Sequence, residues 1–189
     1  INGVPSVGFT NAGQARSRGA ELEGLWQFTP NDQIGGYLTY LDAEVTEWPN
    51  ATDTFRGEAF TFDAKGQKLP NSPEMTFRVA YSHSFDLGDW GELLPTVSTF
   101  WSDKSWIGVT NGPQDFNKDY WRSDFFLRYQ TVEENFWIEA YANNIEDHRY
   151  KTTYLNLLTE AENGNPGGGM QWVGYTSGRV LGLRLGYRF

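Results

Sequence analysis

Hydrophobic and polar residues alternate along most of the chain, and the clearest alternation lies at its C-terminal end. From position 181 onward every second residue is apolar, with glycine or arginine between. Successive side chains of a β-strand point to opposite faces, so this segment would have one apolar and one polar face. The apolar positions are Leu181, Leu183, Leu185, Tyr187 and Phe189.

Six earlier segments can also be read as strands with a period of two, although in the fourth, residues 94–106, Val97 and Trp101 alternate against Phe100 without favouring either face. In the first of them, Leu22 and Trp26 share one face, while Glu21 and Glu23 share the other. Turn-forming residues such as proline, asparagine and glycine stand between the segments. The predicted strands span residues 14–29, 33–46, 75–85, 94–106, 121–130, 136–143 and 179–189.

The connections between these strands alternate between short turns and long loops. Short turns are predicted at 30–32, 86–89 and 133–135, and long loops at 47–72, around 111–113 and at 151–177. All the short connections would therefore lie at one end of the sheet. Outer-membrane β-barrels show this asymmetry, with short periplasmic turns and long external loops. The pattern predicts an all-β protein, an antiparallel up-and-down transmembrane β-barrel.

The composition fits this fold class. Aromatic residues make up 16% of the chain, there are 21 glycines, and the mean hydropathy is -0.57. No run approaches the roughly eighteen apolar residues of a membrane-spanning helix, whereas the strands of a barrel are much less apolar overall. A net charge of -9 argues against a nucleic-acid partner, and the absence of cysteine excludes disulfides and thiol chemistry.

Seven strands are an odd number, whereas single-chain bacterial barrels close with an even number. An open sheet edge cannot lie in lipid, because its backbone N–H and C=O groups would have no partner there. We therefore expect residues 1–189 to be an incomplete barrel of about seven strands, the C-terminal part of a larger one.

Four stretches resemble the C-terminal barrel portion of the TonB-dependent outer-membrane receptors. They are residues 11–24 (NAGQARSRGAELEG), 66–73 (GQKLPNSP), 143–150 (NNIEDHRY) and 178–189. The resemblance implies a 22-stranded barrel, plugged by an N-terminal domain, that imports iron-siderophores, cobalamin or glycans. The implied partners are outer-membrane lipid, the plug domain and remaining strands, the inner-membrane TonB complex and the barrel-assembly machinery. The plug domain, the TonB-contacting segment and about fifteen strands have no counterpart in these residues. No cofactor is implied.

Several charged residues fall on the polar face of the predicted strands. Water or a plug domain in the barrel lumen can solvate them, whereas the lipid face would cost several kcal/mol near the bilayer midplane. We expect Arg128 and Glu139 to pair across neighbouring strands. The predicted lumen-facing charges are Arg78, Arg122, Asp124, Arg128, Glu139, Arg184 and Arg188.

The predicted long loops are rich in aromatic residues. Loops on a rigid scaffold are where binding residues collect, and aromatic rings can stack on a sugar or a catecholate. Packing of the loops against each other is an equally good explanation. The candidate ligand-binding residues are Trp48, Phe55, Phe60, Phe62, Trp106, Phe116, Tyr154, Trp172 and Tyr175.

The resemblance also assigns a role to the end of the chain. In the family the terminal aromatic residue is part of the signal that the assembly machinery reads. Here that signal would comprise Leu185, Tyr187 and Phe189.

Two other classes of protein remain open at this point. High aromatic content and acidic charge also fit a soluble β-sandwich that binds carbohydrate. An outer-membrane hydrolase would need a Ser-His-Asp set, and neither His83 nor His148 forms a convincing one. No spacing typical of metal ligands is present. We therefore predict that the chain is not an enzyme and has no catalytic or metal site.

Overall fold

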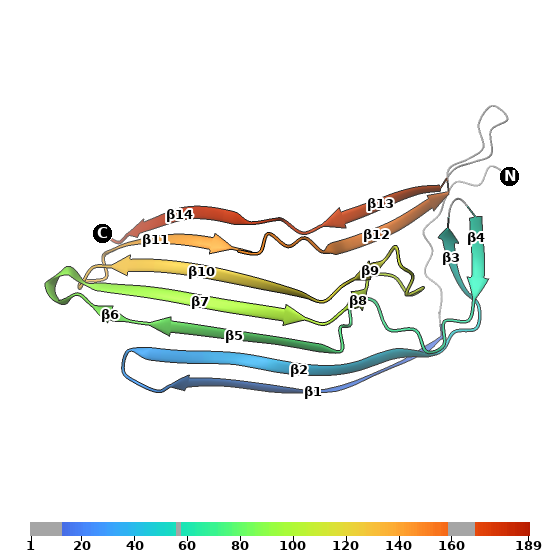
Figure 1. The fold of residues 1–189 in the computed structure, drawn as a ribbon, viewed down its shortest axis with the longest axis horizontal. Coiled ribbons are helices and arrows are strands. Elements are labelled where there is room, and N and C mark those ends of the chain that lie inside the picture. The colour runs from blue at the N-terminus through green and yellow to red at the C-terminus, as the bar shows by residue number, and fades with distance from the viewer. Residues whose placement is uncertain (1–12, 56–57, 159–168) are drawn as a thin grey trace, which may run out of the picture.

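A computed structural model describes residues 13–55, 58–158 and 169–189. Seven long strands form one antiparallel sheet in chain order (Figure 1). Among the described strands, β1 and β14 each have only one partner, so the sheet is open at both edges. The strands are β1 (Gln14–Gln27), β2 (Asp32–Glu47), β5 (Met75–His83), β7 (Glu92–Ser102), β10 (Tyr120–Gln130), β11 (Phe136–Asn143) and β14 (Val180–Tyr187).

The register carries both faces unbroken across the sheet. Residues that lie directly opposite each other in a β-ladder share a face. One apolar row runs from Trp26 to Leu181, and the row beside it, on the opposite face, becomes polar at Ser98 and Asp124. The apolar row contains Trp26, Ile34, Tyr81, Val97, Phe125, Ala142 and Leu181, and the neighbouring row Leu25, Gly35, Ala80, Ser98 and Asp124. The two faces agree with the predicted alternation in six strands; in β7, for which the sequence favoured neither face, the register places Val97 and Trp101 on the apolar side.

All the short connections lie at one end of the sheet, together with the C-terminus (Figure 1). They are residues 28–31, a segment with the two-residue strand β6 (Phe85–Asp86) and the 3-10 helix η1 (Gly88–Trp90), and residues 131–135. No helix among the described residues is long and apolar enough to cross a membrane.

The opposite end differs from the prediction, because the long loops contain strands of their own. The fourth predicted strand is also interrupted at Asp103, whose backbone N–H donates to Met75 O (2.9 Å) and whose carboxylate accepts the N–H of Lys104 (2.8 Å). Three two-stranded hairpins result: β3 (Ala51–Phe55) with β4 (Glu58–Phe62), β8 (Ser105–Trp106) with β9 (Phe116–Asn117), and β12 (Lys151–Leu158) with β13 (Gly169–Tyr175).

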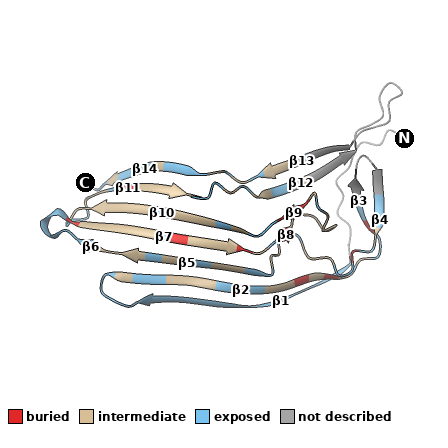
Figure 2. Ribbon diagram, in the orientation of Figure 1, coloured by how far each residue is buried: buried red, intermediate tan, exposed pale blue. Residues whose placement is uncertain are grey.

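Burial on the main sheet is the reverse of that in a water-soluble protein. On the inner strand β7, Val97 of the apolar face is 45% exposed, whereas its neighbour Ser98 on the polar face is 4% exposed. Figure 2 shows buried residues on β7, whereas the edge strand β1 is exposed on both faces. In water, apolar surface of this extent would cost about 25 cal/mol per Å². The small buried apolar cluster lies at the long-loop end instead, around Val45, Ala51 and Ala64. The apolar face of the sheet is therefore the one that meets lipid, and the polar face is the lumen wall.

Candidate functional site

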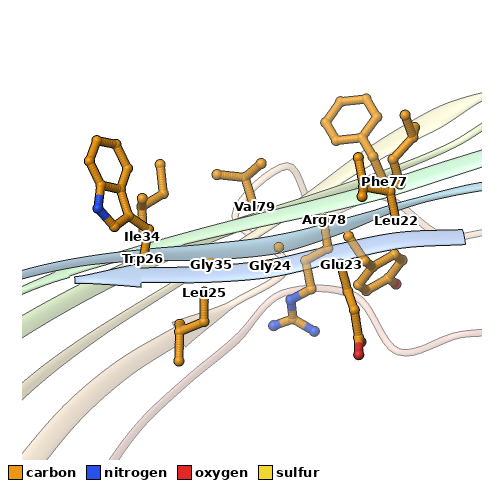
Figure 3. A pocket seen from close by; sticks show the side chains of 13 residues that line it. Leu22, Glu23, Gly24, Leu25, Trp26, Ile34, Gly35, Phe77, Arg78 and Val79 are labelled. Atoms are coloured by element: carbon orange, nitrogen blue, oxygen red, sulfur yellow. The ribbon is translucent and has the colours of Figure 1, made fainter. Parts of the chain in front are cut away.

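The middle of the polar face is a network of charged and hydroxyl groups. The Arg78 guanidinium donates to Ser98 Oγ (3.0 Å) and lies 3.9 Å from the Asp124 carboxylate. Asp124 also accepts the backbone N–H of Asn144 (2.9 Å). Figure 3 shows that Arg78 points to this side of the sheet, whereas its neighbour Val79 points to the other. This network joins β5, β7 and β10 to the start of the loop after β11 on the polar face of the sheet.

Glu139 has a different partner from the one predicted. Arg128 lies directly opposite Glu139 in the register, but the Glu139 carboxylate accepts hydrogen bonds from Arg184, on the other neighbouring strand. The Arg128 guanidinium instead stacks over the Trp137 ring (4.6 Å), and its Nε has no hydrogen-bond partner among the described residues. The predicted Arg128–Glu139 ion pair is therefore wrong, because ring stacking competes for Arg128.

The remaining predicted charges lie at the two ends of the same face. Arg122 is opposite Phe100 of β7, and Arg188 follows β14, where its backbone N–H donates to Asn135 O (2.8 Å). Arg188 shares a hollow of about 260 Å³ with Arg128 at the short-turn end. The structure thus places all seven charges on or beside the polar wall.

The predicted loop aromatics form separate groups. Trp106 and Phe116 pack together with ring centroids 5.3 Å apart. Phe60 and Phe62 are 5.7 Å apart, and Trp48 packs with Phe62 against the small apolar cluster. These five residues pack the loops together, which is one of the two explanations that the sequence left open.

Two of the loop aromatics are available for contact. Trp172 and Tyr175 of β13 are both more than half exposed. Tyr154 lies on the partner strand β12, which contacts β3. Phe55 ends β3, but its side chain lies outside the described part of the chain. The β12–β13 hairpin therefore presents the exposed aromatic surface.

A second aromatic group, which the sequence analysis missed, faces the lumen at the long-loop end. The Tyr120 ring stacks on Tyr150 (4.6 Å) and on His148 (5.0 Å, planes 8° apart), and Phe100 lies 6.0 Å away. Tyr120 shares its face with Arg122, two residues later. The sequence alternation could have placed Tyr120 on this face, but the stack itself depends on His148 and Tyr150, about thirty positions further along the chain.

The loop after β11 is organised by one buried side chain. Asn144 is 1% exposed, and its amide donates to His148 O (2.8 Å) and Ser177 O (3.2 Å) while accepting the N–H of His148 (3.0 Å). Its φ of 56° is in the left-handed region, which asparagine tolerates better than most residues. Asn144 therefore holds His148 where it can stack on Tyr120.

A buried carboxyl lies in the loop between β8 and β9. Asp115 is fully buried; Thr110 donates to its Oδ2 (3.2 Å), and its Oδ1 has no hydrogen-bond partner among the described residues. Burial raises the pKa of Asp115, and the charge of Asp53 adds to that effect. Its backbone C=O accepts the N–H of Ile107 (2.9 Å), so it joins the two ends of the loop.

No group of three or more His, Cys, Asp or Glu side chains in the described ranges could hold a metal ion. His83 instead lies 2.6 Å from Asp32 and packs against Phe85. The site is therefore a polar lumen wall with aromatic loops above it.

Comparison with known proteins agrees with this architecture. Residues 1–145 match the family model described as TonB dependent receptor-like, beta-barrel. No curated protein matches the chain.

Two solved structures share the fold. The ferric yersiniabactin uptake receptor FyuA from Yersinia pestis has a TM-score of 0.71 at 22% identity, over 95% of this chain and 24% of the receptor. The siderophore receptor PiuA from Acinetobacter baumannii has a TM-score of 0.66 at 23% identity, over 94% of this chain and 22% of the receptor. The chain thus spans about a quarter of their length.

These matches and the inverted burial exclude the β-sandwich alternative, since among the described residues no second sheet covers the apolar face. Members of the matched family are receptors and transporters of the Gram-negative outer membrane rather than enzymes. The chain belongs to the TonB-dependent receptor-like β-barrel family.

Proposed function

We propose that residues 1–189 form the C-terminal part of a TonB-dependent receptor that takes up a scarce ligand across the outer membrane. The remaining strands and the plug domain would come from the rest of the barrel protein, and the inner-membrane TonB complex would supply energy through the plug. The observation that carries the proposal is a single sheet with one apolar and one polar face, on which Val97 is 45% exposed and its neighbour Ser98 is buried.

An iron-siderophore is the ligand class that the observations favour. Both similar structures are described as receptors for such ligands. The stacked Tyr120, His148 and Tyr150, and the exposed Trp172 and Tyr175, offer rings that stack on aromatic chelating groups. Arg122, near the first group, offers a positive charge to an anionic ferric complex.

The experiment uses the intact receptor that contains these strands. Three probes represent the candidate classes: ferric yersiniabactin, cyanocobalamin and a maltooligosaccharide. We expect quenching of tryptophan fluorescence by the ferric complex only, and TonB-dependent accumulation of iron-55 in cells. W172A with Y175A should weaken binding by about tenfold, equivalent to about 1.4 kcal/mol.

V132A, at an exposed position of the short-turn end, is the matched control and should bind as the wild type does. Binding of cyanocobalamin or the oligosaccharide alone would reject the siderophore class but keep the receptor. Absence of TonB-dependent uptake of all three probes by a correctly folded barrel would count against the proposed function.

A further inference from the structure

Two asparagine side chains tie the segment of β8 and β9 to its neighbouring loops. Asn111 accepts the backbone N–H of Lys68 (2.6 Å) and donates to Lys68 O (3.0 Å). Asn117 accepts the N–H of Lys151 (2.9 Å) and donates to Lys151 O (2.9 Å). An asparagine amide has an acceptor and a donor side by side, so it can bind both backbone groups of one residue as a neighbouring strand would. We call these contacts the Asn111 bridge and the Asn117 bridge.

Of the two bridges, the Asn117 bridge lies next to the aromatic stack. Asn117 ends β9 three residues before Tyr120, and Lys151 directly follows Tyr150. The Tyr120 and Tyr150 rings have centroids 4.6 Å apart and planes 20° apart. The bridge thus joins the two chain segments that carry these rings. The Asn111 bridge ends instead in the connection before β5.

The Asn117 bridge is buried and reinforced. Asn117 is only 7% exposed. Lys151 also binds back to the β8–β9 segment, since its ammonium group donates to Gln114 O (2.7 Å) and Phe116 O (3.2 Å). Four hydrogen bonds therefore join Lys151 to this segment. Because buried polar groups that lose their partners cost free energy, this arrangement strongly favours one position of Lys151.

Tyr150 is held from its other side as well. Its N–H donates to Thr176 Oγ1 (3.2 Å), and its C=O accepts the N–H of Thr176 (3.0 Å). Tyr120 and Tyr150 are nevertheless only partly buried. The structure thus fixes the backbone beside the two rings without burying these residues completely. Side chains that are already ordered bind a ligand at a smaller entropic cost.

We propose that Asn117 is a positioning residue for ligand binding. The Asn117 bridge holds Tyr150 against Tyr120, so that the two rings form a stacking surface before the ligand arrives. The ligand is one with planar aromatic chelating groups, which can stack on these rings. This inference rests on the proposed function, because the two rings meet a ligand only if the barrel takes up such a complex.

The β8–β9 segment offers a matched pair of variants. N117A removes both hydrogen bonds of the Asn117 bridge. N111G removes the Asn111 bridge and a further bond to Gly108 O (3.2 Å), and glycine tolerates the φ of 49° at this position. The two variants lose the same kind of contact in the same segment, but only N117A acts beside Tyr120. Y120L removes one ring of the stack and completes a double-mutant cycle with N117A.

Binding is measured on the intact receptor by the quenching of tryptophan fluorescence with ferric yersiniabactin. N117A should weaken binding by about tenfold, whereas N111G should bind as the wild type does. In the Y120L background N117A should have no further effect, because the ring against which it positions Tyr150 is missing. An equal loss in N111G, or an undiminished effect of N117A in the Y120L background, would overturn the proposal.

Fluorine NMR of the unliganded receptor, labelled with fluorotyrosine, tests the positioning without a ligand. The Tyr150 signal, identified by its absence in Y150L, should move in N117A toward its position in Y120L and stay unchanged in N111G. An unmoved signal in N117A, with heat-modifiable migration confirming a folded barrel, would overturn the positioning role. If the wild type binds none of the ferric, cobalamin and oligosaccharide probes, the proposed function fails, while the NMR result still decides the role of Asn117.

Discussion

The carboxylate of Glu139 binds the guanidinium of Arg184 across the β11–β14 pairing. Glu139 is almost completely buried, whereas Arg184 keeps about half of its side chain exposed. The ion pair therefore joins the last strand of the chain to the strand before it on the lumen wall. The Arg184 guanidinium also lies over the rings of Phe126 and Tyr141, with its carbon 6.0 and 5.4 Å from the ring centroids.

We predict that R184Q destabilises the intact barrel by about 1–3 kcal/mol, because it leaves a buried carboxylate without its main partner. Urea unfolding in lipid vesicles, followed by tryptophan fluorescence, measures the change. In double-mutant cycles the coupling of Glu139 to Arg184 should exceed its coupling to Arg128. The reverse order would show that Arg128 is the true partner.

Asn144 should be hard to replace for two separate reasons. N144A loses the hydrogen bonds to His148 and Ser177 and strains the positive φ, whereas N144G loses only the hydrogen bonds. We expect both variants to raise the rate of proteolysis within residues 145–150. The local stability of N144A should be lower than that of N144G by about 1 kcal/mol, because only alanine is strained at this φ. Equal protection of all three proteins from the protease would argue against this role.

Stability of the loop between β8 and β9 should depend on pH through Asp115. Its folded pKa is raised above the unfolded value by burial, so its contribution is fully present below the unfolded pKa and is lost as pH rises through the folded pKa. Hydrogen exchange at the Ile107 amide, corrected for the intrinsic effect of pH, should show less protection at neutral pH than at about pH 4. D115N should remove this dependence, and a dependence that persists in D115N would exclude Asp115 as its source.

Phe189 should contribute to assembly more than to the folded barrel. Its ring contacts Tyr187 (5.1 Å between centroids) but is otherwise fully exposed at the end of the apolar face. Deletion of Phe189 from the intact receptor should lower the amount of heat-modifiable barrel in outer membranes several-fold. A change of that size in the ratio of assembled to unassembled protein corresponds to about 1 kcal/mol. R188Q serves as the control, and an undiminished yield after deletion would remove Phe189 from the assembly signal.

The sequence by itself determined the seven long strands, most of their two faces and the end at which the short turns lie. These features are local, because a period of two assigns each side chain to a face regardless of its neighbours. The short turns also fixed three neighbouring pairs, because such turns join adjacent antiparallel strands. The pairings across the three long loops came from the structure. The alternation of side chains along each strand also placed Arg78, Asp124 and Arg184 on the polar face.

Only the tertiary structure decided which groups meet across the sheet and at its ends. Glu139 has an arginine opposite it on each side, and the choice between them depends on Trp137, which holds Arg128 by stacking. The contact of Asn144 with Asp124 and the stack of Tyr120 on Tyr150 join residues 20 or more positions apart. Long-range pairing of this kind depends on packing geometry, which a local alternation of apolar and polar residues does not encode.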